Sequence, residues 1–477
     1  MVVLYCAFLK GGKMKEKLFL KRFKINGLFG LYNVNIPFDS NINIFVGENG
    51  LGKTTILNAL NYVIQGDSEG LSTINFESIE LTLGNNKTIK ILHDDLSANN
   101  LSMRNRNYLA HYFHDEDYGY IVRRVMLEVL KENSPKILDD KDSREKLFEK
   151  ISKKYKYDFP SYVMDRIYNT ILKNDEFTKE LKKSWEYKLY EYMKEWKQII
   201  YLPTYRRIEE DFNNYIENSP DKEYYRKTKR RNNFSYLQFG MDDVQEAIDN
   251  ACNTLKNNTN EGFKAMTSNL LTNYIEIDEN KNKDLNFKNF DASTLDIVFS
   301  RLADKIDPNV KDKIIYMVEN KKIDNDKYSK YLLSIINELT NIYEKNKQFD
   351  DNIENFKNVC NNYLVNKQIK YDKFRIECKV EQSNGNGEIS LKNLSSGEKQ
   401  ILSLFSKLYL NLNDSNIILF DEPELSLSLI WQKKLMPDII NSNRCGFVMA
   451  ITHSPFIFDN DFKDNTRDIK EYIDFME

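Results

Sequence analysis

The sequence predicts an α/β fold that is interrupted by a long helical segment. Short apolar runs alternate with amphipathic helices over residues 16–100, and the same alternation returns from residue 371. Residues 101 to about 370 differ, because they are rich in Lys, Glu and Asn and mostly helical in period. We therefore expect the two ends to form one mixed sheet flanked by helices. The expected parts are a first half at 14–100, a helical insertion at 101–370 whose strand near 198–212 returns to the sheet, and a second half at 371–477.

Composition limits the classes of protein. The net charge of the 477 residues is -3, which argues against a protein that binds nucleic acid over its whole surface. Apolar stretches stay well short of the roughly 20 residues of a membrane helix, so we expect a cytoplasmic protein without membrane contact. The five cysteines are scattered and form no CxxC pair, which indicates a reducing compartment. We interpret the apolar start as an unstructured leader, with Met14 as an alternative first residue.

The first half, residues 14–100, is predicted to contain strands and one helix. Residues 17–25 alternate like a strand, and 27–38 continue as a turn and a second strand. Residues 42–47 form a short apolar run of the buried kind. Residues 53–65 have helical spacing, and 78–92 read as a hairpin that turns at Gly84.

The insertion contains a heptad pattern, a seam of apolar residues spaced three and four apart, that predicts a long helix. The seam has one polar residue, Asn346. Two arrangements fit: an amphipathic helix on the core of its own domain, or a protruding antiparallel hairpin packed on another helix of the insertion. The seam consists of Tyr328, Leu332, Ile335, Leu339, Ile342, Asn346, Phe349, Ile353, Phe356, Cys360 and Tyr363.

The second half returns to strands. Residues 373–394 read as a hairpin that turns at 384–387, and an apolar helix follows around 401–408. The runs "NIILF" (416–420) and "GFVMAIT" (446–452) predict two buried strands.

The motif "GENGLGKTT" (47–55) predicts a phosphate-binding loop, because it follows a buried strand and opens a helix. Glycines let the loop curl so that backbone N–H groups point at phosphate oxygens, and the helix N-terminus adds partial positive charge. Lys53 would reach the β- and γ-phosphates, and the Thr54 hydroxyl would bind Mg²⁺. The expected nucleotide contacts here are Gly47, Asn49, Gly50, Gly52, Lys53, Thr54 and Thr55.

Two acidic residues follow the strand in "NIILFDEPE" (416–424). We expect Asp421 to hold Mg²⁺ through water and Glu422 to act as the general base on the attacking water. His453 ends the next strand, in "MAITHSP", where it would contact the γ-phosphate. Ligands in open α/β sheets bind at the carboxyl ends of strands, so all three are placed suitably.

The stretch "LSSGEKQ" (394–400) predicts a second helix N-terminus able to hold an anion. One nucleotide does not need two such cradles from one chain, whereas two chains facing head to tail would supply one each. The residues concerned are Ser395, Ser396 and Gly397.

Along the chain the order is the phosphate-loop motif, the serine-glycine stretch, the acidic pair and His453, and four such motifs in this order resemble those of the ABC-type P-loop ATPases. The resemblance implies that ATP and Mg²⁺ lie between Lys53 of one protomer and Ser396 and Gly397 of another. It therefore implies a homodimer or higher homo-oligomer. Two features depart from the family: Ser428-Leu429 stands where relatives show His-Pro, and Gln65 is a poor candidate for the Q-loop glutamine.

A helical insertion between the halves resembles the layout of SMC, RecF and OLD-type ATPases. The stretches "DEPELSL", "WQKKLMPDII", "AITHSPFIF", "YLPTYRRIEEDF" and "FGMDDV" look like those of the ATPase subunits of the anti-phage systems Septu and PARIS. OLD-type proteins carry a TOPRIM nuclease domain after the ATPase, and this chain ends soon after His453. The resemblance thus implies a sensor or regulator with a separate nuclease or toxin subunit of TOPRIM or HNH type and a phage protein as trigger. The alternatives are a RecF/SMC-like DNA-repair or DNA-organising ATPase and a scaffold that binds ATP without hydrolysis.

Other polar groups allow two interpretations each. The basic run at 226–231 is either a solvated loop or a DNA or RNA contact. Arg206 and Arg207 either contact nucleotide or pair with neighbouring glutamates. His111 and His114 share a helical face but have no third metal ligand nearby, which favours a surface position.

Overall fold

The protein divides into two compact units, 1–237 with 413–477, and 238–412. Each is described by itself below. Among the described residues, no helix has both the length and the apolar character needed to cross a membrane. The computed structural model describes residues 17–48, 50–96, 125–127, 129–130, 145–147, 149, 175–194, 196, 198–203, 241–275, 292–301, 307–319, 327–385, 387–411 and 415–476.

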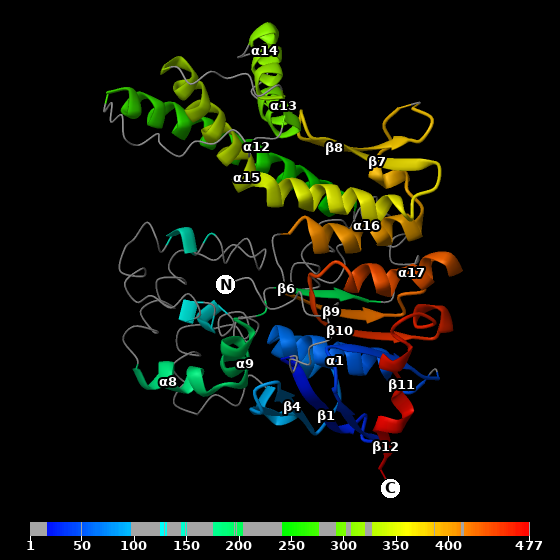
Figure 1. Ribbon diagram of the computed structural model, residues 1–477. Helices are drawn as coiled ribbons and strands as arrows, with labels where there is room; N and C mark the ends of the chain where they lie inside the picture. Colours follow the sequence, from blue (N-terminus) through cyan, green and yellow to red (C-terminus); the bar gives the residue numbers. More distant parts are fainter. Residues whose placement is uncertain are drawn as a thin grey trace, which may run out of the picture. The chain divides into compact units, whose positions relative to one another are not determined.

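Two five-stranded sheets are seen in the described part of the first unit (Figure 1). One has the order β12-β2-β1-β4-β5 and antiparallel neighbours. The other has the order β11-β3-β10-β9-β6 and parallel neighbours. The strands are β1 Leu20–Leu28, β2 Tyr32–Pro37, β3 Ile42–Val46, β4 Ser78–Leu83, β5 Thr88–Leu92, β6 Gln198–Leu202, β9 Asn416–Asp421, β10 Cys445–Thr452, β11 Thr466–Asp468 and β12 Ile473–Phe475.

The burial of each strand explains its pattern of apolar and polar residues. Strand β5 alternates between buried and exposed residues, as expected of a strand with one face in the core. All of β9, and β10 after its first residue, is buried. A strand covered on both faces needs a continuous apolar run, which is what the sequence showed at 416–420 and 446–452.

Helix α1 (Lys53–Gln65) lies between the two sheets (Figure 1). Its apolar residues share one core with side chains of both sheets, including Phe23, Ile79, Leu419 and Met449. The glycine that ends the helix, Gly66, has a left-handed φ of 66°. The other helical elements bounded in the described part of this unit are α2 Ser68–Ser72, η1 His93–Leu96, α8 Asp175–Lys183, α9 Trp185–Met193, α17 Leu429–Ile440, η6 Pro455–Ile457, η7 Lys463–Asn465 and η8 Ile469–Tyr472.

Strand β6 joins the parallel sheet although it is far from its neighbour in the sequence. Its residues pair with β9 from Gln198 opposite Asn416 to Leu202 opposite Phe420. The Tyr201 hydroxyl donates a hydrogen bond of 2.6 Å to Asn58 on α1. This strand therefore contacts the helix that follows the phosphate-loop motif.

The second unit is mostly helical, with two long helices that pack along each other in opposite directions (Figure 1). The two helices approach closely at Gly262, where a Cβ would lie 2.9 Å from the Ile342 side chain. Further elements surround the pair. The elements are α12 Met241–Ile275, α13 Ala292–Arg301, α14 Pro308–Glu319, α15 Lys327–Asn361, β7 Lys367–Asp372, β8 Glu377–Gln382, η5 Leu391–Asn393 and α16 Ser396–Tyr409.

Helix α15 confirms the long helix expected from the heptad pattern. Among the seam residues, Leu339, Ile342, Ile353, Phe356 and Cys360 are buried. The helix packs on α12 and also on α13 and α16. The observed arrangement thus combines the two alternatives, because the helix pairs with a second helix and also covers the core of its own unit.

The hairpin after α15 differs from the expected one. β7 pairs with β8 from Lys367 opposite Gln382 to Asp372 opposite Glu377, so the chain turns at 373–376. The chain also turns back after Gln382, as expected: the Gln382 N–H donates to the Gly387 carbonyl at 3.1 Å and the Ile389 N–H to the Val380 carbonyl at 2.8 Å, on either side of a bridge between Glu381 and Glu388. The predicted hairpin began at residue 373, whereas its first strand, β7, ends at Asp372.

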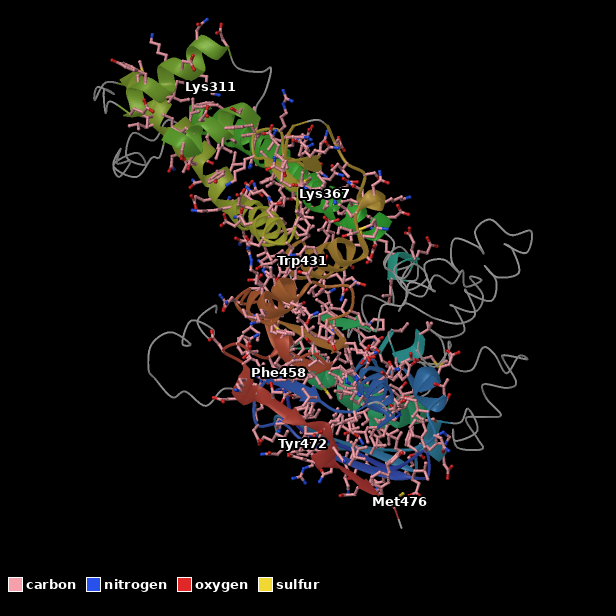
Figure 2. The ribbon with its side chains drawn as sticks, turned by 90° about the vertical axis from the view of Figure 1, so that its right-hand side faces the viewer. Lys311, Lys367, Trp431, Phe458, Tyr472 and Met476 are labelled. Carbon is pink, nitrogen blue, oxygen red and sulfur yellow. The ribbon has the colours of Figure 1, made fainter. Side chains whose placement is uncertain are left out.

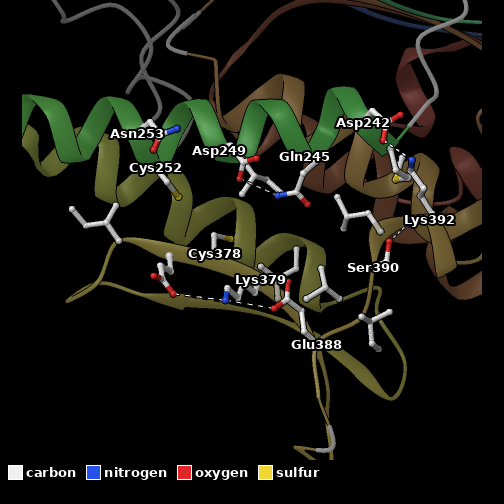
Figure 3. Close-up of a pocket in the computed structure, with 18 of the residues that line it drawn as sticks. Asp242, Gln245, Asp249, Cys252, Asn253, Cys378, Lys379, Glu388, Ser390 and Lys392 are labelled. Carbon is white, nitrogen blue, oxygen red and sulfur yellow. Dashed lines mark hydrogen bonds and ion pairs between the residues drawn. The ribbon is translucent and has the colours of Figure 1, made fainter.

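A cavity of about 620 Å³ lies between α12 and β8 in the second unit (Figure 3). Its floor is apolar and includes Ile248 and Val380, both 4% exposed. Ion pairs edge it, among them Lys392 with Asp242 at 3.0 Å.

The α/β sheets of the first unit and the paired helices of the second together confirm the predicted fold class. The described strands of the first unit nevertheless form two sheets, one antiparallel and one parallel, rather than the single mixed sheet expected, because the apolar residues of α1 pack between them.

Candidate functional site

Three parallel strands place the acidic and basic candidates at one edge of a sheet. In β3, Val46 lies opposite Thr452 of β10, and Ile451 of β10 lies opposite Asp421 of β9. Parallel strands end at the same edge, so the segments that follow β3, β9 and β10 meet there. This edge therefore gathers the phosphate-loop motif, the acidic pair and His453.

The loop between β3 and α1 has the backbone that the motif predicts. Gly50 and Gly52 have positive φ angles of 90° and 72°, which strongly favour glycine. A Cβ on Gly47 would lie 2.6 Å from the Ile469 side chain, so that position also requires glycine. Gly52 is the N-cap of α1, and its lack of a side chain leaves the first amides of the helix uncovered. The loop thus offers amides to an anion.

Lys53 is buried at the start of this helix, with 6% of its surface exposed. Its ammonium donates to the carbonyl oxygens of Gly47 at 3.0 Å and Glu48 at 2.6 Å. Burial lowers the pKa of Lys53, while the carboxylates of Glu422 and Asp421 oppose that shift. These carboxylates place the ammonium in an acidic surrounding that favours its charged form.

Thr54 and Asp421 meet across the sheet edge. The Thr54 hydroxyl donates a hydrogen bond of 2.9 Å to a carboxylate oxygen of Asp421, although the two residues lie far apart in the sequence. Thr54 is exposed, and Asp421 is buried at the end of β9. Hydroxyl and carboxylate oxygens are the ligands that Mg²⁺ prefers, so this donor set fits the ion. Thr55 follows on the first turn of α1, half-buried.

Glu422 has a strained backbone that directs its carboxylate. Its φ is 49°, in the left-handed region that costs a non-glycine residue about 1–2 kcal/mol. Its N–H donates to the carbonyl of Ile451 at 2.8 Å, which fixes the strained position. Burial raises the pKa of Glu422, and the charges of Asp421 and Glu424 raise it further. A carboxylate with a raised pKa is a better proton acceptor.

His453 directly follows β10 and faces Glu422. Its Nε2 lies 3.8 Å from a Glu422 oxygen, and its side chain is 34% exposed. Its backbone N–H donates to the Glu424 carboxylate at 2.6 Å, and Thr452 donates to the other oxygen of Glu424 at 2.7 Å. The sequence analysis did not single out Glu424 or Thr452. The only signal was the second glutamate of the "DEPE" stretch, which carried no indication of its partner.

The serine-glycine stretch lies in the second unit, at the start of α16. Ser395 is the N-cap and forms a capping box with Glu398: the Ser395 hydroxyl accepts from Glu398 N–H, and the Glu398 carboxylate accepts from Ser395 N–H at 2.8 Å. Ser396 is half-buried and Gly397 is buried. The capping box confirms a helix N-terminus at this stretch, and the role of the three residues in nucleotide binding stays a prediction.

The structure does not place the remaining candidates of the sequence analysis at this sheet edge. Gln65 donates its amide to Asn61 of its own helix at 2.9 Å. The candidates that lie outside the described residues are Met14, Asn49, His111, His114, Arg206, Arg207, Arg226, Lys227, Lys229, Arg230 and Arg231.

Residues 19–458 match the family model for the AAA ATPase domain. The chain belongs to this family of ATPases. Membership supports ATP binding and ATPase activity in general, and the predicted fold class is accordingly that of an ABC-type P-loop ATPase head with a helical insertion.

Other likenesses are local or weak. A segment of 46 residues is 41% identical to the DNA replication and repair protein RecF of two strains of Lactobacillus delbrueckii subsp. bulgaricus, which is 10% of this chain and 12% of each relative. The Smc head domain from Pyrococcus furiosus, solved with an extended coiled coil bound to the C-terminal domain of ScpA, is 13% identical with a TM-score of 0.32 and 96% of each chain covered. The Smc head domain from Pyrococcus yayanosii is 15% identical with a TM-score of 0.30, covering 92% of this chain and 93% of that one. Scores this low do not by themselves establish a common fold.

Proposed function

We propose that the protein is an ABC-type ATPase in which two copies jointly bind each nucleotide. The observation that carries the ATPase part of the proposal is the contact of 2.9 Å between Thr54 and Asp421, with Glu422 and His453 3.8 Å apart at the same sheet edge. This arrangement joins a phosphate loop, a Mg²⁺ donor set and a proton acceptor.

The residues of the first unit take distinct roles. The loop glycines and Lys53 bind the phosphates, and the Thr54 hydroxyl and Asp421 would hold Mg²⁺, which would neutralise phosphate charge when bound. Glu422 accepts the proton of the attacking water, and its raised pKa suits that role. His453 contacts the γ-phosphate side of the nucleotide.

The second unit supplies the other half of the pocket from a second copy. The start of α16 carries Ser395, Ser396 and Gly397, and the N-terminus of a helix favours an anion. Binding of ATP then joins the copies as a homodimer or higher homo-oligomer, and hydrolysis releases them.

Anti-phage defence is the proposed setting. The stretches that resemble those of the Septu and PARIS ATPase subunits motivate this setting: a cytoplasmic sensor that responds to a phage protein and controls a separate nuclease or toxin, with DNA or RNA as a further candidate ligand. The antiparallel helix pair α12 and α15 offers an element that rearrangement of the heads would move.

Glu422→Gln tests whether ATP binding joins two copies of the chain. The variant should bind ATP without hydrolysing it, so that size exclusion with ATP and Mg²⁺ shows a larger assembly than without nucleotide. Lys53→Ala is the matched control, because it should lose ATP binding and stay in the nucleotide-free state. An elution volume of Glu422→Gln that ATP does not change would contradict the shared site.

Mixing two inactive variants tests whether each nucleotide site is formed by residues of two chains. Lys53→Ala and Ser396→Arg should each lack turnover. A heterodimer of the two has one site with both residues intact, so the mixture should recover turnover if the residues act across the interface. A mixture as inactive as its components would show that one chain supplies both.

A further inference from the structure

We infer that Glu424 is a positioning residue that holds His453 opposite Glu422. The inference rests on the proposed ATPase function, in which these two residues act on the γ-phosphate and the attacking water. It assigns Glu424, Thr452 and Gln432 to a hydrogen-bonded brace between the segments that follow β9 and β10.

The Glu424 carboxylate holds the second segment at two points. Oε2 accepts from the Thr452 hydroxyl at 2.7 Å, and Oε1 accepts from the His453 N–H at 2.6 Å. The Thr452 hydroxyl in turn accepts from the Ser454 N–H at 3.0 Å. Three consecutive residues, from Thr452 at the end of β10 to Ser454, are therefore tied, directly or through Thr452, to one carboxylate.

Gln432 on α17 closes the brace from the other side. Its amide donates to the carbonyl of Leu427 at 2.9 Å, and its carbonyl accepts from the Ser454 hydroxyl at 2.6 Å. Gln432 is 7% exposed and Thr452 is fully buried, so water competes little for these bonds. The segment after β9 is thus tied by hydrogen bonds to the end of β10 and the residues after it.

The brace sets the geometry of the reacting groups. The Glu422 backbone is held by its N–H bond to Ile451, and the His453 backbone is held by its N–H bond to Glu424. The position of the imidazole beside Glu422 therefore depends on the Glu424 carboxylate. Since a misplacement of about 1 Å costs roughly 100-fold in rate, loss of this tie should slow hydrolysis more than it weakens ATP binding.

A Gln substitution separates positioning from chemistry. Glutamine at 424 has one acceptor for the His453 N–H, and its NH₂ can donate to Thr452, whose hydroxyl is able to accept. A positioning role is therefore largely restored by Gln, whereas a role as a second base is lost with either Gln or Ala. Thr452→Val, which removes the acceptor, should cancel the rescue.

The experiment measures steady-state ATPase activity of the full chain. Glu424→Ala should lower kcat by roughly 10- to 100-fold with a KM for ATP within about 3-fold of the wild type. Glu424→Gln should recover most of the loss, and Glu424→Gln with Thr452→Val should not. Equal losses of kcat in Glu424→Gln and Glu424→Ala would overturn the inference, as would a change in KM alone.

A measurement that does not depend on ATP hydrolysis tests the hydrogen bond between Glu424 and His453 independently of the proposed function. The chain has four histidines, so ¹⁵N-histidine labelling gives four amide signals. The His453 amide proton, bonded to a carboxylate, should move upfield in Glu424→Ala while the other three stay in place. If it does not move, the brace is absent even where ATPase activity is present. If it moves but the wild type has no ATPase activity, the proposed function fails and the brace stands.

Discussion

Replacement of Glu398 by Ala should loosen the start of α16. The carboxylate accepts from the N–H and the hydroxyl of Ser395 at 2.8 and 2.9 Å, and from the Lys367 ammonium at 2.9 Å through each oxygen. Figure 2 labels Lys367, at the start of β7. Burial alone would raise the pKa of Glu398, but the hydrogen bonds from Lys367 and Ser395 outweigh it and hold the pKa below its ordinary value.

The magnitude follows from the contacts. Loss of an N-cap arrangement costs about 1 kcal/mol. Hydrogen bonds to a charged group contribute about 1.5–3 kcal/mol, here toward the lower end because Lys367 is 26% exposed while Glu398 is 5% exposed. We therefore expect Glu398→Ala to lower the free energy of local opening of α16 by roughly 2–4 kcal/mol.

Hydrogen exchange of peptides covering α16 measures this free energy, since a single unfolding energy is poorly defined for a chain of two units. A double-mutant cycle with Lys367→Ala should give a coupling of about 1–2 kcal/mol. The exposed pair Lys370–Glu381 on the same hairpin, 3.5 Å apart with side chains 64% and 27% exposed, is the matched control. Its coupling should stay below about 0.5 kcal/mol. A Glu398 coupling no larger than that of the control would refute the reasoning.

Three further predictions concern stability. Because the pKa of Glu398 is lowered, its contribution is present above the ordinary value of 4.5 and is lost as pH falls through the folded value; protection of α16 should fall in acid, and Glu398→Gln should remove that dependence. Asp350→Ala should lower the free energy of local opening of α13 and α15, measured by hydrogen exchange, by about 3–5 kcal/mol, because it leaves the Arg301 guanidinium, 2% exposed, without its carboxylate and with only the bond to the Lys373 carbonyl among those described. Replacing both residues by apolar ones should cost much less. Gly446→Val should lower the free energy of opening of β10 by at least about 1–3 kcal/mol and alter the fluorescence of Trp196, because a Cβ at Gly446 would overlap the Trp196 ring. Gly446→Ala should show a smaller change, and equal stability of both variants to the wild type would contradict the contact.

The sequence alone determined those elements whose signals are local. The helix expected at 53–65 is present with those bounds, because amphipathic spacing and flanking glycines act over a few residues. The buried strand that ends at Asp421 was predicted for the same reason. The candidate residues around Lys53 and Asp421 followed from their position after these strands, a rule that applies to any parallel sheet.

Tertiary structure alone decided which distant segments meet. No local signal paired β6 with β9, set the register of β7 and β8, or joined Glu424 to Thr452 and His453. The same holds for Lys367 and Glu398, whose charges gave no reason to expect contact with each other rather than with water. A charged or polar side chain has many partners that satisfy it equally well, and its choice among them is made only when the apolar core brings particular backbones together.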